Sequence, residues 1–153
     1  MQPDIDVRLG DHRFNFRVAA VILRDGCVLM CSLPGSGWCF LPGGRVRAGE
    51  PTRPALEREL HEELGIRVTA GPLAMVVENF FPDAVGRFHE LGLYYLVDLP
   101  RDVDPTTLTD AENGATFRWV ELDALPSTDL RPRFLCDALR RDLSSTEHFV
   151  NVE

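Results

Sequence analysis

Three glutamates, Glu59, Glu62 and Glu63, lie close together shortly before a glycine. On a helix, at about 100° per residue, their carboxylates share one arc of about 100°. Like charges at this spacing cost about 0.2–0.5 kcal/mol per pair, so the pattern is poor for stability, although a solvated acidic face is the simplest alternative. The glycine-containing loop 41–44 precedes them and lets a ligand approach the backbone. Clustered carboxylates beside a free backbone carbonyl suit a hard divalent cation such as Mg²⁺.

The segment that carries these glutamates has the spacing of an amphipathic helix. It can begin at Glu50 or Thr52, because the prolines nearby are tolerated only in a first turn, and it is expected to end at Gly65. Arg58 lies one turn before Glu62, where its guanidinium can orient that carboxylate. One stripe of leucines is expected to pack on the core: Leu56, Leu60 and Leu64.

This stretch resembles the Nudix box, the signature of the Nudix hydrolase (MutT-like) family, which reads G-x5-E-x7-R-E-U-x-E-E-x-G-U with U a bulky aliphatic residue. Every specified position is filled at the required spacing, by Gly44, Glu50, Arg58, Glu59, Leu60, Glu62, Glu63, Gly65 and Ile66. The resemblance implies hydrolysis of a nucleoside diphosphate linked to another moiety, with Mg²⁺ or Mn²⁺ as the metal. It leaves that moiety open.

The resemblance also implies roles for individual residues of the box. Glu59 and Glu63 are the first choice as metal ligands and Glu62 is the next, while the carbonyl of Gly43 or Gly44 is implied to complete the set. The residues expected to be structural rather than catalytic are Gly44, Glu50 and Arg58.

The general base is left open between a box glutamate and a carboxylate from a later loop. Glu62 is the candidate within the box. Glu112, in the polar loop before the strand around Trp119, is the candidate outside it, because relatives place an extra glutamate in that region. An ordinary solvated loop acid is the alternative for Glu112, and Glu90, at the head of a long strand, is a further candidate.

Several residues outside the carboxylate cluster are candidates for substrate contacts. Arg45 and Arg47 lie in the loop beside the proposed metal site and can hold outer phosphates, although surface arginines are the alternative. Trp38 can stack on a base or serve only in packing. His61 points away from the carboxylates and is interpreted as exposed or structural, whereas His89 can line the pocket.

Composition limits the classes of function. The 153 residues carry a net charge of −8, which argues against a surface that coats a nucleic acid polymer. All basic residues are arginines, so a lysine Schiff base and a phosphate-loop lysine are excluded. No apolar run is long enough to span a membrane and the N-terminus does not resemble a secretory signal. The four cysteines lack zinc-site spacing, so we expect buried thiols and a cytoplasmic location.

The order of elements predicts one α+β domain. Residues 1–13 are interpreted as a polar, poorly ordered extension, 14–143 as a single Nudix domain and 144–153 as a frayed tail. Within the domain, strands are expected at 14–23 and 27–33 around an Asp-Gly turn, at 73–81 and 88–99 as a second hairpin, and at 117–122, with an amphipathic helix at 133–143. The resemblance sharpens this to a Nudix-type α/β/α sandwich, a mixed central sheet with flanking helices.

The leading hypothesis is a Mg²⁺-dependent pyrophosphohydrolase of a small nucleotide derivative. Nucleoside triphosphates, ADP-ribose and nucleotide sugars compete as substrates, and a homodimer stays open. A Nudix-fold binding module without catalysis is the second hypothesis, although such modules usually lose box glutamates. Isomerase chemistry on an isoprenoid diphosphate is a third, because Cys39 lies near the box in sequence.

Overall fold

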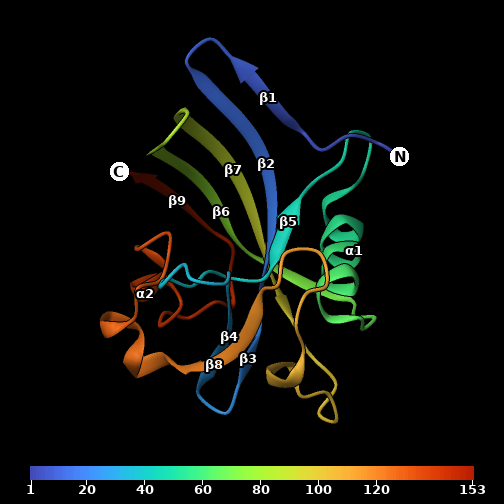
Figure 1. Cartoon of the computed structure of the whole chain (residues 1–153). Coiled ribbons are helices and arrows are strands. Elements are labelled where there is room, and N and C mark those ends of the chain that lie inside the picture. The colour runs from blue at the N-terminus through green and yellow to red at the C-terminus, as the bar shows by residue number, and fades with distance from the viewer.

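The molecule is organised around a mixed β-sheet whose long strands curve across it, as the computed structural model of residues 1–153 in Figure 1 shows. Its strands follow the spatial order β1-β2-β7-β6-β9, and the short β5 pairs with β2. The bounds are β1 (Asp6–Leu9), β2 (His12–Val21), β5 (Gly43–Arg45), β6 (Ala70–Asp83), β7 (Gly86–Val97) and β9 (Glu147–Val152). Strands β2 and β7 are parallel, as are β6 and β9, while β6 and β7 form the expected antiparallel hairpin.

A smaller antiparallel sheet contains the expected Asp-Gly turn. Its order is β3-β4-β8, with bounds β3 (Leu23–Arg24), β4 (Cys27–Ser32) and β8 (Thr116–Glu121). Asp25 and Gly26 both adopt positive φ angles, which is the geometry a two-residue hairpin turn requires. The expected strand 14–23 is divided, however, because β2 pairs within the large sheet and only the two residues of β3 pair with β4.

The helix of the box begins and ends at residues that the sequence predicts. Helix α1 (Thr52–Leu64) is followed by Gly65, whose φ of 69° is left-handed and whose N–H donates to the carbonyl of His61. This is the usual way in which a glycine ends a helix. The buried residues of α1 are Ala55, Leu56, Leu60 and Leu64, so the predicted leucine stripe is confirmed.

The second predicted helix is much shorter than expected. Instead of a helix over 133–143, α2 covers only Leu135–Ala138. The backbone N–H groups of Arg140 and Arg141 donate to carbonyls three residues earlier, so the chain continues in tighter turns. Hydrophobic spacing alone was misleading because the segment packs its apolar side chains on the core without extending the helix. Two short 3₁₀ segments, η1 (Pro105–Thr107) and η2 (Leu122–Ser127), complete the elements.

Both chain ends are part of the sheet, contrary to the expectation of a poorly ordered extension and a frayed tail. Strand β1 pairs with β2 from Asp6 to Leu9, and β9 pairs with β6 from Glu147 to Val152. Strand β9 alternates partly buried and exposed residues, with Phe149 and Asn151 partly buried, whereas β1 is exposed beyond Asp6. Sequence polarity was misleading here because an edge strand exposes many of its side chains.

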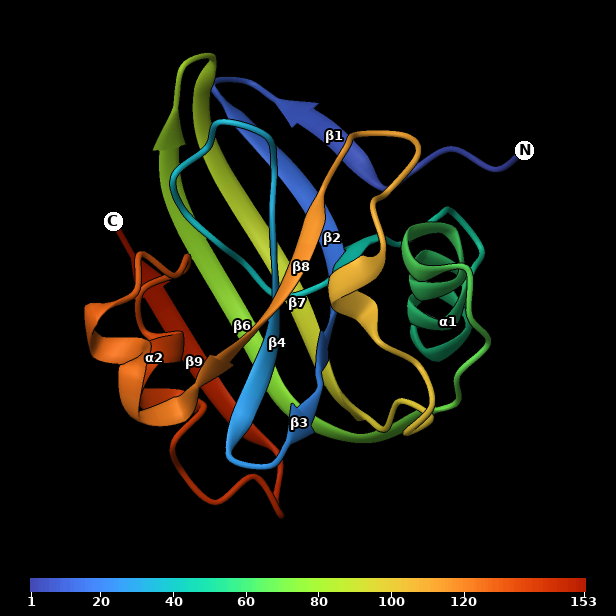
Figure 2. The same ribbon diagram turned by 60° about the horizontal axis from the view of Figure 1, so that its bottom comes forward.

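The core lies on both faces of the large sheet, with α1 on one side and α2 on the other (Figures 1 and 2). Along β2 the residues alternate between the two faces: Val18 and Ala20 pack in the cluster that contains Leu56 and Leu60 of α1, and Ala19 packs in the other cluster. This arrangement confirms the predicted α+β class with a mixed sheet between helices. No helix is both long and apolar enough to cross a lipid bilayer.

Candidate metal and nucleotide site

The glycine loop approaches the carboxylates of α1 closely. A Cβ atom on Gly44 would collide with the carboxyl group of Glu59, and a Cβ on Gly43 would collide with the backbone of Val18 and Ala19 in β2. Gly43 also has a positive φ of 152°. Only glycines therefore let β5 pair with β2 while bringing its backbone against the acidic face of α1.

Glu63 is the most unusual carboxylate in the protein. Its Oε2 atom is inaccessible to solvent and has no hydrogen-bond partner. Burial raises the pKa of Glu63 to about 8, opposed by the charge of Arg17 and reinforced by the charge of Glu59. A buried acceptor without a partner is costly unless a ligand satisfies it, so Glu63 is suited to a cation.

Arg58 connects the other box carboxylates. Its guanidinium donates to both carboxylate oxygens of Glu50, at 2.8 and 2.9 Å, to Glu59 at 2.7 Å and to Glu62 at 3.2 Å. The hydrogen bonds from Arg58 lower the pKa of Glu50, whereas burial raises the pKa of Glu59. Glu50 also accepts a hydrogen bond from the backbone N–H of Arg47. The expected structural roles of Glu50 and Arg58 thus have a clear geometric basis.

Glu62 and the two loop arginines take part in ion pairs. Glu62 is more exposed than its neighbours and pairs with Arg47 at 3.3 Å as well as with Arg58. Arg45 pairs at 3.1 Å with Asp6 of β1, which Arg13 also contacts. The candidates for phosphate binding, Arg45 and Arg47, therefore lie beside the site but are already engaged by carboxylates of the protein.

The carboxylate oxygens of the box suit a divalent cation, but they do not converge as a complete metal site. No three acidic, histidine or cysteine side chains converge on one point, because arginines hold Glu59 and Glu62. Glu63 nevertheless offers an oxygen without a partner, and the charge of Glu59 acts on it. Oxygen donors of this kind are the ligands that Mg²⁺ and Mn²⁺ prefer. Glu59 and Glu63 thus influence each other through their charges, and a cation would have to compete with Arg58 for Glu59.

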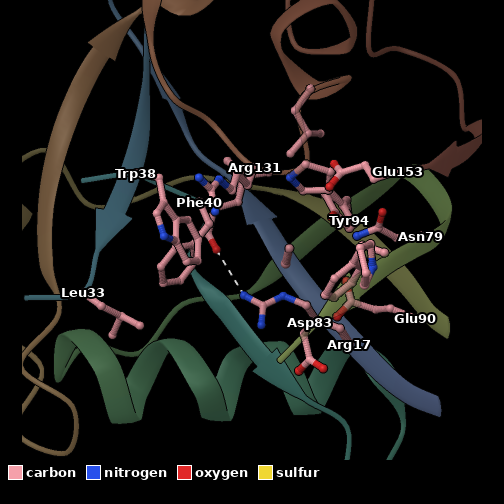
Figure 3. Close-up of a pocket in the computed structure, with 16 residues that line it drawn as sticks. Arg17, Leu33, Trp38, Phe40, Asn79, Asp83, Glu90, Tyr94, Arg131 and Glu153 are labelled. Atoms are coloured by element: carbon pink, nitrogen blue, oxygen red, sulfur yellow. Dashed lines mark hydrogen bonds between the residues drawn. The ribbon is translucent and has the colours of Figure 1, made fainter. Parts of the chain in front are cut away.

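A cavity of about 590 Å³ lies between the large sheet and the loops that follow β4 and β8 (Figure 3), and its lining includes Arg17, whose charge acts on Glu63. Trp38 forms part of its wall, with the Arg131 guanidinium 4.9 Å from the centre of its ring and the Phe40 ring 5.3 Å away. The opposite wall comes from the sheet and includes Asn79 and Glu90. The cavity is large enough for a nucleoside, and it joins an aromatic wall to a polar one.

Arg17 of β2 is a functional candidate that the sequence interpretation missed. It lines the cavity, and Figure 3 shows its guanidinium directed to the carbonyl of Leu41, 3.4 Å away. Its charge acts on Glu63 and on Glu90, so it lies between the carboxylates and the cavity. An arginine within a predicted apolar strand was the available signal, since a charge seldom occurs there without a partner.

Asp110 is the second missed residue. It is 5% exposed, and its charge acts on Glu63, whereas Glu112 is exposed on the turn that follows. The backbone N–H of Glu112 donates to the Asp110 carboxylate at 2.8 Å. The structure therefore brings Asp110, rather than the predicted Glu112, toward the carboxylate cluster. The local signal was weak because aspartate is common in turns, and asparagine and glycine follow within four residues.

The two histidines considered in the sequence do not contribute to this site. His61 is exposed on α1, as expected. His89 lies on the opposite face of β7 from Glu90, where its ring packs 4.5 Å from Phe80 and 5.4 Å from Phe14. His89 is absent from the residues that line the cavity, so the prediction that it lines the pocket is wrong.

Comparison with known proteins identifies the family. A model of the NUDIX domain matches residues 13–136. Over 86 residues the chain is 48% identical to the CTP pyrophosphohydrolase of Escherichia coli K12, a match covering 53% of this chain and 61% of that protein. Over 92 residues it is 33% identical to nucleoside triphosphatase NudI of Salmonella arizonae, covering 52% and 63%. The chain thus spans about three fifths of the length of these relatives.

A solved structure extends the likeness to most of the fold. The solution structure of the E. coli ORF135 protein matches with a TM-score of 0.60 and 28% identity, covering 88% of this chain and 94% of that one. The family model covers the box, strands β2, β5, β6 and β7 of the large sheet and the aromatic wall of the cavity, but neither β1 nor β9. Together with the box geometry, these matches show that the chain belongs to the Nudix domain family.

Proposed function

We propose that this protein is a divalent-metal-dependent pyrophosphohydrolase that cleaves a phosphoanhydride bond of a small nucleotide, with a nucleoside triphosphate as the first substrate to test. The observation that carries the proposal is the buried, partnerless oxygen of Glu63, which is coupled through the charge of Arg17 to a nucleoside-sized cavity. CTP heads the list because a relative at 48% identity bears the name CTP pyrophosphohydrolase. ADP-ribose and nucleotide sugars are the competing substrates.

The box residues would hold Mg²⁺ or Mn²⁺ through Glu59 and Glu63, with Glu62 and the carbonyl of Gly43 as further ligands. When bound, such an ion neutralises phosphate oxygens and makes a nearby water molecule more acidic. Arg58 keeps Glu59 and Glu50 in place through its hydrogen bonds. Glu63 would gain most from such an ion, because its Oε2 atom has no partner in the protein, whereas Glu59 is already paired with Arg58.

The remaining residues position the substrate. Arg17 lies between the carboxylates and the cavity, so it is the guanidinium best placed to contact a phosphate there. Trp38 provides a flat apolar surface for a base. Water attacks phosphorus, the bridging P–O bond breaks, and the proton of the water passes to a carboxylate. Glu62 and Asp110 are the two candidates for that acceptor, with Asp110 in the place expected for Glu112.

A substrate panel tests the proposal. CTP, the other nucleoside triphosphates, ADP-ribose and a UDP-sugar are incubated with Mg²⁺, with Mn²⁺ and with a chelator, and both products are weighed by mass spectrometry. We expect metal-dependent release of a nucleoside monophosphate. Reaction in ¹⁸O-labelled water then shows which phosphorus is attacked. Lack of turnover on every compound, with nucleotide binding retained, would instead support the non-catalytic binding module.

Variants assayed on the same substrates distinguish the two candidate proton acceptors. Glu62→Gln and Asp110→Asn are compared at saturating metal, and the true acceptor is the one whose loss removes the acidic limb of the rate profile with pH. Exclusion of nucleic acid polymers, a cytoplasmic location and a homodimer are further parts of the proposal. The net charge of −8 supports the first, while cell fractionation and light scattering test the other two.

A further inference from the structure

A row of polar side chains crosses the large sheet at one level of its register. Asn151 of β9 is aligned with Asn79 of β6, Asn79 with Glu90 of β7, and Glu90 with Asn15 of β2. Side chains aligned in this way point to the same face of a sheet. Asn79 and Glu90 lie where this row borders the cavity. Four polar residues in line across a sheet are unexpected in a face that otherwise packs the core.

The C-terminal strand determines how the amide of Asn79 is oriented. The Nδ2 group of Asn151 donates to Oδ1 of Asn79 at 2.8 Å, and it also lies 3.4 Å from a carboxylate oxygen of Glu153. A carboxylate can only accept, so Glu153 favours the orientation of Asn151 that turns its Nδ2 group inward. That group in turn requires an acceptor from Asn79. The Nδ2 group of Asn79 is therefore left to face another partner.

The free donor of Asn79 faces the cavity. Asn79 is 5% exposed and lines the cavity, and Figure 3 shows it beside Glu90 on the wall opposite Trp38. Its Nδ2 group makes no hydrogen bond to the protein and is not among the buried polar atoms that lack a partner, so the cavity reaches it. Glu90, which is aligned with Asn79 on the neighbouring strand, forms no salt bridge and adds carboxylate oxygens to the same wall. The wall thus presents one donor beside one acceptor.

We propose that Asn79 is a specificity-determining residue that reads the hydrogen-bonding edge of the nucleobase, with its orientation set by Asn151 and Glu153 of the C-terminal strand. This inference rests on the proposed function, which requires a nucleotide in the cavity. Each natural base carries an acceptor next to an N–H donor on its pairing edge, which is the complement of the Asn79 and Glu90 pair. Trp38 on the opposite wall supplies the stacking surface that a flat base needs.

Cytosine and uracil have opposite arrangements of hydrogen-bond donor and acceptor at ring positions 3 and 4. Adenine and guanine have opposite arrangements at positions 1 and 6. For a base that is held in one orientation by its ribose, a fixed donor therefore discriminates within each pair. The discriminating power is about tenfold or more, because a wrong partner leaves a buried polar group unsatisfied. An amide that could rotate freely would lose this discrimination, since it offers a donor or an acceptor equally well.

The decisive change is Asn151→Asp, made alone and together with Glu153→Gln. Aspartate at position 151 can only accept, so the amide of Asn79 turns to donate to it and presents Oδ1 to the cavity. The Glu153→Gln change removes the repulsion between two carboxylates and supplies a donor to the new aspartate. Val150→Thr is the matched control, because Val150 lies on the same strand, is 59% exposed and points to the other face.

Binding is measured by calorimetry without divalent metal, using CTP against UTP and ATP against GTP. We expect wild type to discriminate within at least one pair, and the double variant to change that ratio by about tenfold or more, toward or past unity. Val150→Thr should keep the wild-type ratio. Asn79→Leu should abolish discrimination while retaining affinity from stacking.

Three results would overturn the inference. One is a wild-type protein that binds all four nucleotides equally, and another is a double variant that weakens every nucleotide by the same factor. The third is a Val150→Thr protein that changes the ratio as much as the double variant does. Hydrolysis without base discrimination refutes only this inference, whereas absence of both binding and hydrolysis refutes the proposed function with it.

Discussion

Replacing Glu63 by glutamine removes the charge that the metal-free protein accommodates least well. Burial raises the pKa of Glu63 from 4.5 to about 8, so between these values the native protein holds a proton that the unfolded chain has released. Stability conferred by a raised carboxyl pKa is present at low pH and is lost as pH rises through the folded pKa. The loss proceeds at up to about 1.4 kcal/mol per pH unit.

The assay is urea denaturation in the presence of a chelator, at intervals from pH 4.5 to 8.5. Wild-type stability should fall across this window by at most about 5 kcal/mol, and by less where solvent reaches the side chain. In the Glu63→Gln protein the fall should be markedly smaller, so that the variant is the more stable protein at pH 8. Glu62→Gln serves as the control, since Glu62 is exposed and paired with two arginines.

The same substitution is expected to have the opposite effect on function. With saturating Mg²⁺, the turnover of Glu63→Gln should fall on the order of 100-fold, because a neutral amide is a poor ligand for a hard cation. Metal affinity of the wild-type protein should rise with pH up to about 8, since protons compete for Glu63. A variant with the wild-type dependence of stability on pH, or with unchanged turnover, would refute the account of the carboxylate site.

Three further substitutions test other parts of the site. Arg58→Met should destabilise the protein by about 3 kcal/mol in urea denaturation, because it leaves Glu50 and Glu59 without their guanidinium; an effect below about 0.5 kcal/mol would show that the network is dispensable. Gly44→Ala should displace the Glu59 carboxyl group and weaken metal binding about tenfold or more by calorimetry, and normal affinity would contradict the close approach. Trp38→Ala should raise KM about tenfold with little change in kcat if the ring only binds the base; a selective fall in kcat would contradict that role.

The short-range features of this protein could be predicted because neighbours in sequence decide them. The ends of α1 follow from the tolerance of proline in a first turn and from the left-handed conformation at Gly65. The turn at Asp25 and Gly26 follows from the same preference for positive φ. Helical periodicity likewise places Glu59 and Glu63 on one face, whatever surrounds the helix.

The sequence by itself therefore determined the acidic face, the glycine bend before it and the family chemistry that they imply. Only the tertiary structure decided which distant residues lie near the site, because strand pairing places Arg17 and Asn79 on one cavity and the loop before β8 brings Asp110 toward Glu63. It also decided that the C-terminal residues form β9, where Asn151 reaches Asn79. Such contacts depend on sheet order and register, which local spacing does not specify.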